Sequence, residues 1–138
     1  MVWQLITAAF TVADLLTGWM DARITNKGIK AGIGIEGNEL ITTIFRTQKP
    51  SLVQLAGYNV AKLALWMGVG LIFAYHFPAT SATSPVYLGR VLCPIFAAVD
   101  AAKHYQGFRQ WAWMFRNPGK RVEDQENTAW QKFIGFWG

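Results

Sequence analysis

The sequence predicts an all-α integral membrane protein, with three transmembrane helices followed by amphipathic cytoplasmic helices. Three observations favour this fold class. Only 15% of the 138 residues are charged, whereas an ordinary soluble domain has about 25%. Three segments of the chain are long, apolar and nearly free of charge. The basic residues gather in the parts of the chain that would meet on one side of a membrane.

The expected spans cover about residues 2–24, 52–76 and 85–105, each close to the length of about 20 residues that a helix needs to cross the hydrocarbon. The second span follows a capping box, Ser51-x-x-Gln54, and the third follows Ser84-Pro85, an N-cap before a proline at the first helical position. These spans form an expected transmembrane domain of residues 1–106. A Trp-rich tail of residues 107–138 follows it.

The basic residues predict the orientation. With three crossings, residues 23–49 and everything after residue 102 lie on one side, and the positive-inside rule places that side in the cytoplasm and the N-terminus outside. The alternative, a soluble helical core with a paired buried ion, does not account for this asymmetry. The start Met1-Val2-Trp3-Gln4 lacks the basic residues of a cleavable signal, so the first helix is expected to stay in the protein. Eleven of the thirteen cations lie on the cytoplasmic side: Arg23, Lys27, Lys30, Arg46, Lys49, Lys103, Arg109, Arg116, Lys120, Arg121 and Lys132.

Residues 27–38 hold several glycines, which predict a flexible loop, and residues 39–47 predict a short helix before Pro50. The glycines do not make a nucleotide-binding loop, because neither a Walker sequence nor a preceding strand is present.

The tail has an amphipathic pattern, with apolar residues at i, i+3, i+4 and i+7 from Phe108 to Phe115, and Asn117-Pro118-Gly119 should end that helix. A final short helix is expected after Thr128-x-x-Gln131. Basic, Trp-rich helices suit a lipid interface or the groove of a partner protein. Nucleic-acid binding is disfavoured, because the cations are spread along the flanks of membrane segments. The expected interface anchors are Phe108, Trp111, Phe115, Trp130, Phe133 and Trp137.

A charge at membrane depth costs about 2.5 to 3.5 kcal/mol on insertion scales, so it should face the bundle interior with a partner. On the first helix, Asp14 shares one face with Gly18 and Asp21. Its depth matches that of Lys62, which predicts an Asp14–Lys62 ion pair, with Asp100 further toward the cytoplasm. Whether these residues only fix helix register or form a proton relay or binding site stays open. The expected polar cluster is Asp14, Asn59, Lys62, Asp100 and His104.

A motif in the first half resembles small prokaryotic three-helix membrane proteins of unknown function. Those proteins carry D-x-x-T, then G-x-E-x-N-P-L, then an intramembrane lysine. The match rests on Asp14, Thr17, Glu36, Asn38 and Lys62, with Glu39 in place of the proline. The resemblance covers about residues 5–105 and implies three membrane helices but no activity.

A second resemblance is to the CDP-alcohol phosphotransferases, which implies a membrane enzyme that acts on phospholipids. Thr17 replaces one metal-binding carboxylate of that family, and its members have more membrane helices than this chain. The pattern that carries it is Asp14-x2-Thr17-Gly18-x3-Ala22-Arg23-x8-Gly32-x3-Glu36-x2-Glu39.

The leading interpretation is a non-catalytic membrane subunit that packs against and stabilises a larger membrane complex or copies of itself, with lipids around it. The alternative is a small transporter or ion- or proton-coupled protein that uses Asp14, Lys62, Asp100 and His104, and water access to Lys62 would separate the two. A phospholipid-type transferase comes third. No catalytic residue, metal site or cofactor is expected, because the chain has one cysteine and two histidines.

Overall fold

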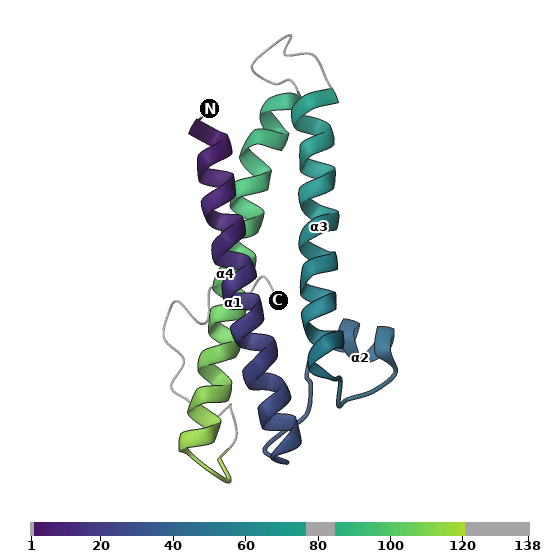
Figure 1. The fold of residues 1–138 in the computed structure, drawn as a ribbon, viewed down its shortest axis with the longest axis vertical. Coiled ribbons are helices and arrows are strands. Elements are labelled where there is room, and N and C mark those ends of the chain that lie inside the picture. Colours follow the sequence, from purple (N-terminus) through teal and green to yellow (C-terminus); the bar gives the residue numbers. More distant parts are fainter. Residues whose placement is uncertain (1, 77–84, 121–138) are drawn as a thin grey trace.

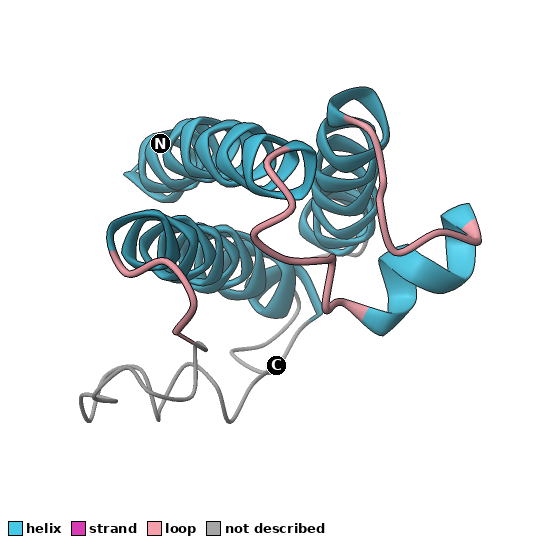
Figure 2. Ribbon diagram, turned by 90° about the horizontal axis from the view of Figure 1, so that it is seen from below, coloured by secondary structure: helices cyan, strands magenta, loops and turns pink. Residues whose placement is uncertain are grey.

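The computed structural model describes residues 2–76 and 85–120. This part of the chain contains four helices and no strand: α1 (Val2–Lys30), α2 (Glu39–Phe45), α3 (Leu52–His76) and α4 (Pro85–Arg116). The three long helices run side by side: α1 and α4 run in one direction and α3 in the opposite one. The short helix α2 lies beside the start of α3 (Figures 1 and 2). The all-α prediction is confirmed for these residues.

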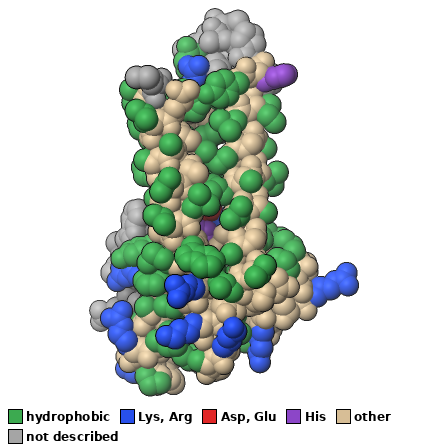
Figure 3. All heavy atoms as spheres, viewed as in Figure 1, with side chains coloured by type: hydrophobic (Ala, Val, Ile, Leu, Met, Phe, Trp, Pro, Cys, Tyr) green, Lys and Arg blue, Asp and Glu red, His purple; other side chains and the backbone are tan. Residues whose placement is uncertain are grey.

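Two of the long helices are apolar enough to cross a membrane. The mean hydropathy of the most apolar 18 residues is 1.2 in α1 and 1.4 in α3. Only 22% and 17% of those residues are buried inside the chain. Because the core helix of a soluble protein is mostly buried, this exposure indicates a membrane location. Figure 3 shows apolar side chains over the outer faces of both helices.

The predicted start and stop signals are present. Ser51 N–H donates to Gln54 Oε1 at 2.8 Å and Gln54 N–H donates to Ser51 Oγ at 3.3 Å, so the capping box forms and α3 begins at Leu52. The fourth helix begins at Pro85 as expected. It ends at Arg116, immediately before the predicted stop.

The first helix is longer than expected. It continues through Gly28 to Lys30, so the loop predicted from residue 27 begins only after residue 30. Gly28 is buried, and a Cβ there would collide with the Trp111 ring on α4. The contact with Trp111 therefore outweighs the low helix propensity of glycine.

The three long helices do not pack evenly. The first helix packs most extensively on α4 and least on α3. Near its end, α3 meets α4 at backbone distance, because a Cβ on Gly89 would lie 2.6 Å from the Ala74 nitrogen. This contact draws α3 and α4 together at the end of the bundle where α1 begins.

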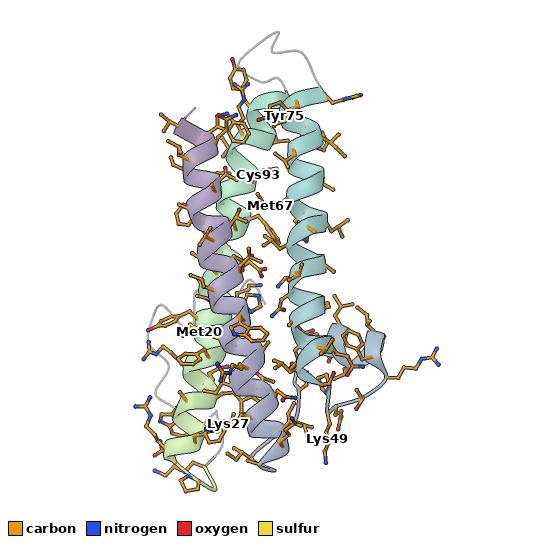
Figure 4. All side chains as sticks on the ribbon, in the orientation of Figure 1. Met20, Lys27, Lys49, Met67, Tyr75 and Cys93 are labelled. Carbon is orange, nitrogen blue, oxygen red and sulfur yellow. The ribbon has the colours of Figure 1, made fainter. Side chains whose placement is uncertain are left out.

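Most described cations lie at the opposite end of the bundle, here called the cationic end. Lys27 and Lys49 lie there, far from Tyr75 (Figure 4), and the blue side chains of Figure 3 gather at this end. The expected boundary between residues 106 and 107 falls inside α4, which runs through it without interruption. Trp130, Phe133 and Trp137 lie outside the described residues.

Candidate functional site

One charged residue from each of the three long helices lies at the same level of the bundle. With a rise of about 1.5 Å per residue, Asp14, Lys62 and Asp100 lie about 18 to 23 Å from the end of the bundle where α1 begins. Asp14 and Asp100 are buried, and Lys62 is half-buried. The structure therefore brings together the side chains that the sequence placed in one cluster.

The ion pair in this cluster is not the predicted one. Lys62 Nζ lies 2.6 Å from Asp100 Oδ1, so the expected Asp14–Lys62 pair is wrong. The reason is the packing: α3 contacts α4 far more than it contacts α1, and this directs the lysine toward Asp100. Rise along the helices fixes depth but not which helices are neighbours.

His104 is the centre of the second half of the cluster. Its Nδ1 lies 3.0 Å from Asp21 Oδ2, while its Nε2 lies 3.9 Å from Asp14 Oδ1 and 3.7 Å from Asp100 Oδ2. Asp21 was placed on the Asp14 face by its spacing but was not included in the predicted cluster. The seven-residue separation, which is two helical turns, was the signal for it.

Two glycines provide the space that this arrangement needs. A Cβ on Gly18 would lie 3.3 Å from His104 Cδ2, and a Cβ on Gly107 would lie 2.7 Å from Asp21 Oδ1. The Asn59 amide donates to the Gly18 carbonyl oxygen at 3.2 Å, which ties α3 to α1 beside the histidine. The absence of side chains at these two positions thus gives the imidazole and its Asp21 partner room between α1 and α4.

Two carboxylate oxygens in the cluster are buried without a hydrogen-bond donor among the described residues: Asp14 Oδ1 and Asp100 Oδ2. The exposed fraction is 3% for the Asp14 side chain and 8% for the Asp100 side chain. An unpaired buried acceptor is costly, so each such atom requires a physical explanation. Both oxygens face His104 Nε2.

A cavity of about 710 Å³ extends from this cluster toward the cationic end, where α3 and α4 are further apart (Figure 1). Its lining includes Lys62, Asp100 and His104, and also Glu36 and Asn38 of the connecting loop. Of the predicted motif, Glu36, Asn38 and Lys62 therefore meet at this cavity, whereas Asp14 and Thr17 do not line it. A smaller opening of about 50 Å³ between α1 and α3 leads to Asp14 and His104, and acidic and histidine side chains show through it in Figure 3.

The loop motif has a structural role of its own. Glu36 Oε1 accepts from the Asn38 N–H at 2.8 Å, and Asn38 Oδ1 accepts from the N–H groups of Leu40 and Ile41 at 3.0 and 3.3 Å. Asn38 is thus the N-cap of α2. Burial raises the pKa of the Glu36 carboxyl, and the charge of Asp21 raises it further, although hydrogen bonds from the loop backbone lower it.

Three of the expected interface anchors lie among the described residues: Trp111 is buried, and Phe108 and Phe115 are half-buried. Trp111 is buried against Gly28 and Gly34. The side chain expected to be an interface anchor at this residue thus packs inside the chain, because the glycines of α1 and the loop make room for it. Phe115 lies under the Lys27 ammonium, 5.3 Å from the ring centre. Phe108 lines a groove between α1 and α4.

The carboxylates of the phosphotransferase-like pattern do not come together. Asp14 lies with Asp100 and His104, whereas Glu36 lies on the loop and Glu39 is exposed in the first turn of α2. This geometry differs from a shared metal site built from the carboxylates of that pattern.

No protein-family model, curated protein or solved structure matches this chain. The resemblance to small three-helix membrane proteins stays a prediction from the motif residues.

Proposed function

We propose that this chain is a small ion- or proton-coupled membrane protein that takes a cation into the polar cluster from its cationic end. One observation carries the proposal: the large cavity joins Lys62, Asp100 and His104 to that end of the bundle. Water access to Lys62 is the property that favours this function over a purely structural cluster. A cavity of this volume has space for many water molecules.

The unpaired acceptors support the same function. A cluster that only fixed helix register would gain most from complete pairing, because a partly paired buried network is less stable than an apolar core. Here Asp14 and Asp100 each keep a buried oxygen without a donor among the described residues. Ionisable groups at membrane depth typically mark ion and proton pathways.

The proposal includes the topology. We place α4 across the membrane as the third span, with the cationic end in the cytoplasm and the N-terminus outside. The charge asymmetry supports this orientation, since cytoplasmic flanks are rich in Lys and Arg. Labelling of a Gly34→Cys variant in intact cells tests it, and modification from outside would contradict the orientation.

Access to the cavity is tested with single cysteines and a charged, membrane-impermeant thiol reagent. We expect Tyr58→Cys and Gln110→Cys, which line the cavity, to react when the reagent is on the cytoplasmic side only. The matched control is Leu65→Cys on the outer face of α3, where the side chain is 66% exposed and would face lipid. Equal protection of all three cysteines would contradict an open cavity. The native Cys93 is buried and sets the background rate.

Coupling is tested in proteoliposomes with a pH-sensitive dye inside and a cation gradient across the membrane. We expect proton or cation flux in the wild-type chain and a loss of at least tenfold in Lys62→Met, with Leu65→Ala unchanged. Absence of flux in the wild-type chain would contradict the proposed function.

A second candidate is the non-catalytic membrane subunit, which one further observation favours. A groove of about 340 Å³ between α1 and α4 has aromatic, apolar and basic residues in its lining: Trp19, Met20, Arg23, Lys27 and Phe108. Met20 and Lys27 mark its position on the lower half of α1 in Figure 4. Aromatic and basic residues together are typical of interface hot spots. A stable complex that dissociates when Phe108 is replaced by serine would support this candidate.

A further inference from the structure

We propose that Asp14, Asp100 and His104 bind one divalent transition metal ion, with Zn²⁺ or Mn²⁺ as the class of ion that fits best. This inference rests on the proposed function, because it identifies the cation that the cluster takes up. It also extends the sequence analysis, which expected no metal site.

The donor atoms lie close together, and two of their separations are short enough for ligands of one metal ion. One nitrogen of His104 and one oxygen each of Asp14 and Asp100 lie within 4.8 Å of one another. The two distances from Nε2 are 3.9 and 3.7 Å, too long for hydrogen bonds. Two ligand atoms that each lie about 2.0–2.2 Å from one ion are at most about 4.4 Å apart, so both distances suit a shared ion.

Asp21 determines which histidine nitrogen is available. The Asp21 carboxylate accepts hydrogen bonds and lies 3.0 Å from His104 Nδ1, so that nitrogen carries a proton. In the neutral imidazole, Nε2 then has a lone pair directed at the two carboxylates. A metal-binding histidine whose other nitrogen donates to a carboxylate is the usual arrangement in metalloproteins.

The charges of the cluster also call for a cation. The groups joined by these contacts include three carboxylates, those of Asp14, Asp21 and Asp100, and one ammonium, that of Lys62. With a neutral histidine these joined groups carry two net negative charges, which attract a divalent ion. The same ion would give Asp14 Oδ1 and Asp100 Oδ2 the partner that the described residues do not supply.

Lys62 and Gly18 are not metal ligands in this arrangement, but they position Asp100 and leave space beside His104. The lysine holds Asp100 Oδ1 at 2.6 Å and leaves the other oxygen, Oδ2, directed at the histidine. Gly18 leaves space beside the imidazole, and both cavities reach His104, which provides a route for the ion. Three protein ligands also leave a coordination position for water or an exchanging ligand.

The donor set selects the class of ion. Imidazole suits Zn²⁺ and the other late transition metals, whereas carboxylates suit Mn²⁺ and harder ions. A site with one imidazole and two carboxylates therefore favours Zn²⁺ or Mn²⁺. Mg²⁺ prefers oxygen ligands only and Cu⁺ prefers sulfur, so both should bind poorly.

The test uses the full-length, tag-free chain in mild detergent, stripped with a chelator and titrated calorimetrically with Zn²⁺, Mn²⁺ and Mg²⁺. We expect one Zn²⁺ or Mn²⁺ ion per chain, and no comparable binding of Mg²⁺. Asp14→Asn, Asp100→Asn and His104→Gln should each weaken binding at least tenfold, and Asp21→Asn should weaken it about 10- to 100-fold by releasing the imidazole. The matched control is His76→Gln, at the exposed end of α3, which should bind as tightly as the wild-type chain.

A second measurement needs no variant of the buried cluster. Co²⁺ replaces Zn²⁺ in the wild-type chain, and we expect visible absorption bands of a low-symmetry nitrogen and oxygen site together with a rise in the unfolding temperature. Failure of the wild-type chain to bind any of these ions, or unchanged binding in all three ligand variants, would overturn the metal site. Metal binding without flux in proteoliposomes would support the site and contradict the proposed coupling, whereas proton flux without metal binding would do the reverse.

Discussion

Lys62 of α3 and Asp100 of α4 form an ion pair, with Nζ 2.6 Å from Oδ1. The pair lies beyond the close contact of Gly89 with α3, toward the end of the bundle where α3 and α4 diverge (Figure 1). It joins the two helices at the inner end of the large cavity. Asp14 lies instead beside His104, with Oδ1 3.9 Å from Nε2, so Asp14 and Lys62 do not form one central pair.

This pairing predicts a specific pattern of coupling in unfolding measurements. Lys62→Met should leave Asp100 as an uncompensated buried charge and destabilise the chain. Because the lysine side chain is 24% exposed, we expect a loss of about 3 kcal/mol, near the lower end for buried pairs. The double variant Lys62→Met/Asp100→Asn should recover most of that loss in thermal unfolding in detergent, measured with a chelator present.

The matched control for this cycle is Lys62→Met combined with Asp14→Asn. Asp14 makes no ion pair with Lys62 among the described contacts, so this combination should recover little stability. Equal recovery in both double variants would contradict the observed pairing.

A second prediction concerns the contact between Gly28 and Trp111. A Cβ on Gly28 would overlap the indole ring, so Gly28→Ala should cost about 1–3 kcal/mol through overpacking. In a Trp111→Leu background the collision is relieved, and the higher helix propensity of alanine should make the same change neutral or stabilising by up to about 1 kcal/mol. Thermal unfolding of the four chains measures this reversal of sign.

The control for the glycine prediction is Gly57→Ala in α3. Nothing lies within 4 Å of a Cβ at that position. Alanine should therefore stabilise the helix slightly in both backgrounds. A destabilising Gly28→Ala in the Trp111→Leu background would show that the indole is not the obstacle.

The local signals in the sequence predicted the helices well. The capping box at Ser51 and the proline at position 85 set the starts of α3 and α4, because a helix start depends on side chains adjacent to it in the sequence. The end of α1 was predicted wrongly, because Gly28 serves a tryptophan that is distant in the chain. Local propensity contains no information about that contact.

The candidate site could be predicted in composition but not in connectivity. The cost of charge at membrane depth selected Asp14, Lys62, Asp100 and His104 from an otherwise apolar sequence. The partner of the lysine depends on which helices approach closely, and that is decided by the glycine contact between α3 and α4. The cavity that joins the loop motif to the cluster is a property of the packed helices and has no sequence signal.

The third prediction is a pH dependence from Glu36. Its pKa lies above the ordinary value of 4.5 because of burial, so the folded chain holds this proton more tightly than the unfolded chain. Its contribution to stability therefore falls as the pH rises from 4.5 through the raised pKa, and is flat above it. Glu36→Gln keeps an acceptor for the Asn38 N–H and removes the charge, so the variant should equal the wild type at pH 4 and exceed it at neutral pH.

The measurement is the difference in unfolding temperature between the two chains at each pH. Glu39→Gln is the control, because Glu39 is exposed in the first turn of α2, where a negative charge is favourable. Its removal should lower stability slightly at neutral pH, the opposite sign. A Glu36→Gln chain that is less stable than wild type at neutral pH would mean that the charge of Glu36 stabilises the loop.

The last prediction separates packing from partner binding in the C-terminal part of the chain, by comparing two truncations. Removal of everything after Gln106 deletes the final turns of α4, including Trp111 over Gly28 and Phe115 beneath Lys27. We expect that chain to lose several kcal/mol, since removing a buried tryptophan alone costs about 3–5 kcal/mol. Removal of everything after Lys120 keeps all of these contacts and should leave the unfolding temperature unchanged within about 2 °C.

Co-purification in mild detergent then distinguishes the two candidate functions. If the chain is a subunit held by aromatic anchors beyond residue 120, the variant cut after Lys120 stays folded, retains the Phe108 groove and loses its partner. If the chain works as an ion-coupled protein, the same truncation keeps its flux in proteoliposomes, because the cluster, the cavity and the Trp111 contact are all intact. Unfolding of the variant cut after Lys120 would show that residues after 120 pack against the bundle. The subunit expectation and the ion-coupling expectation for this variant would then both be wrong.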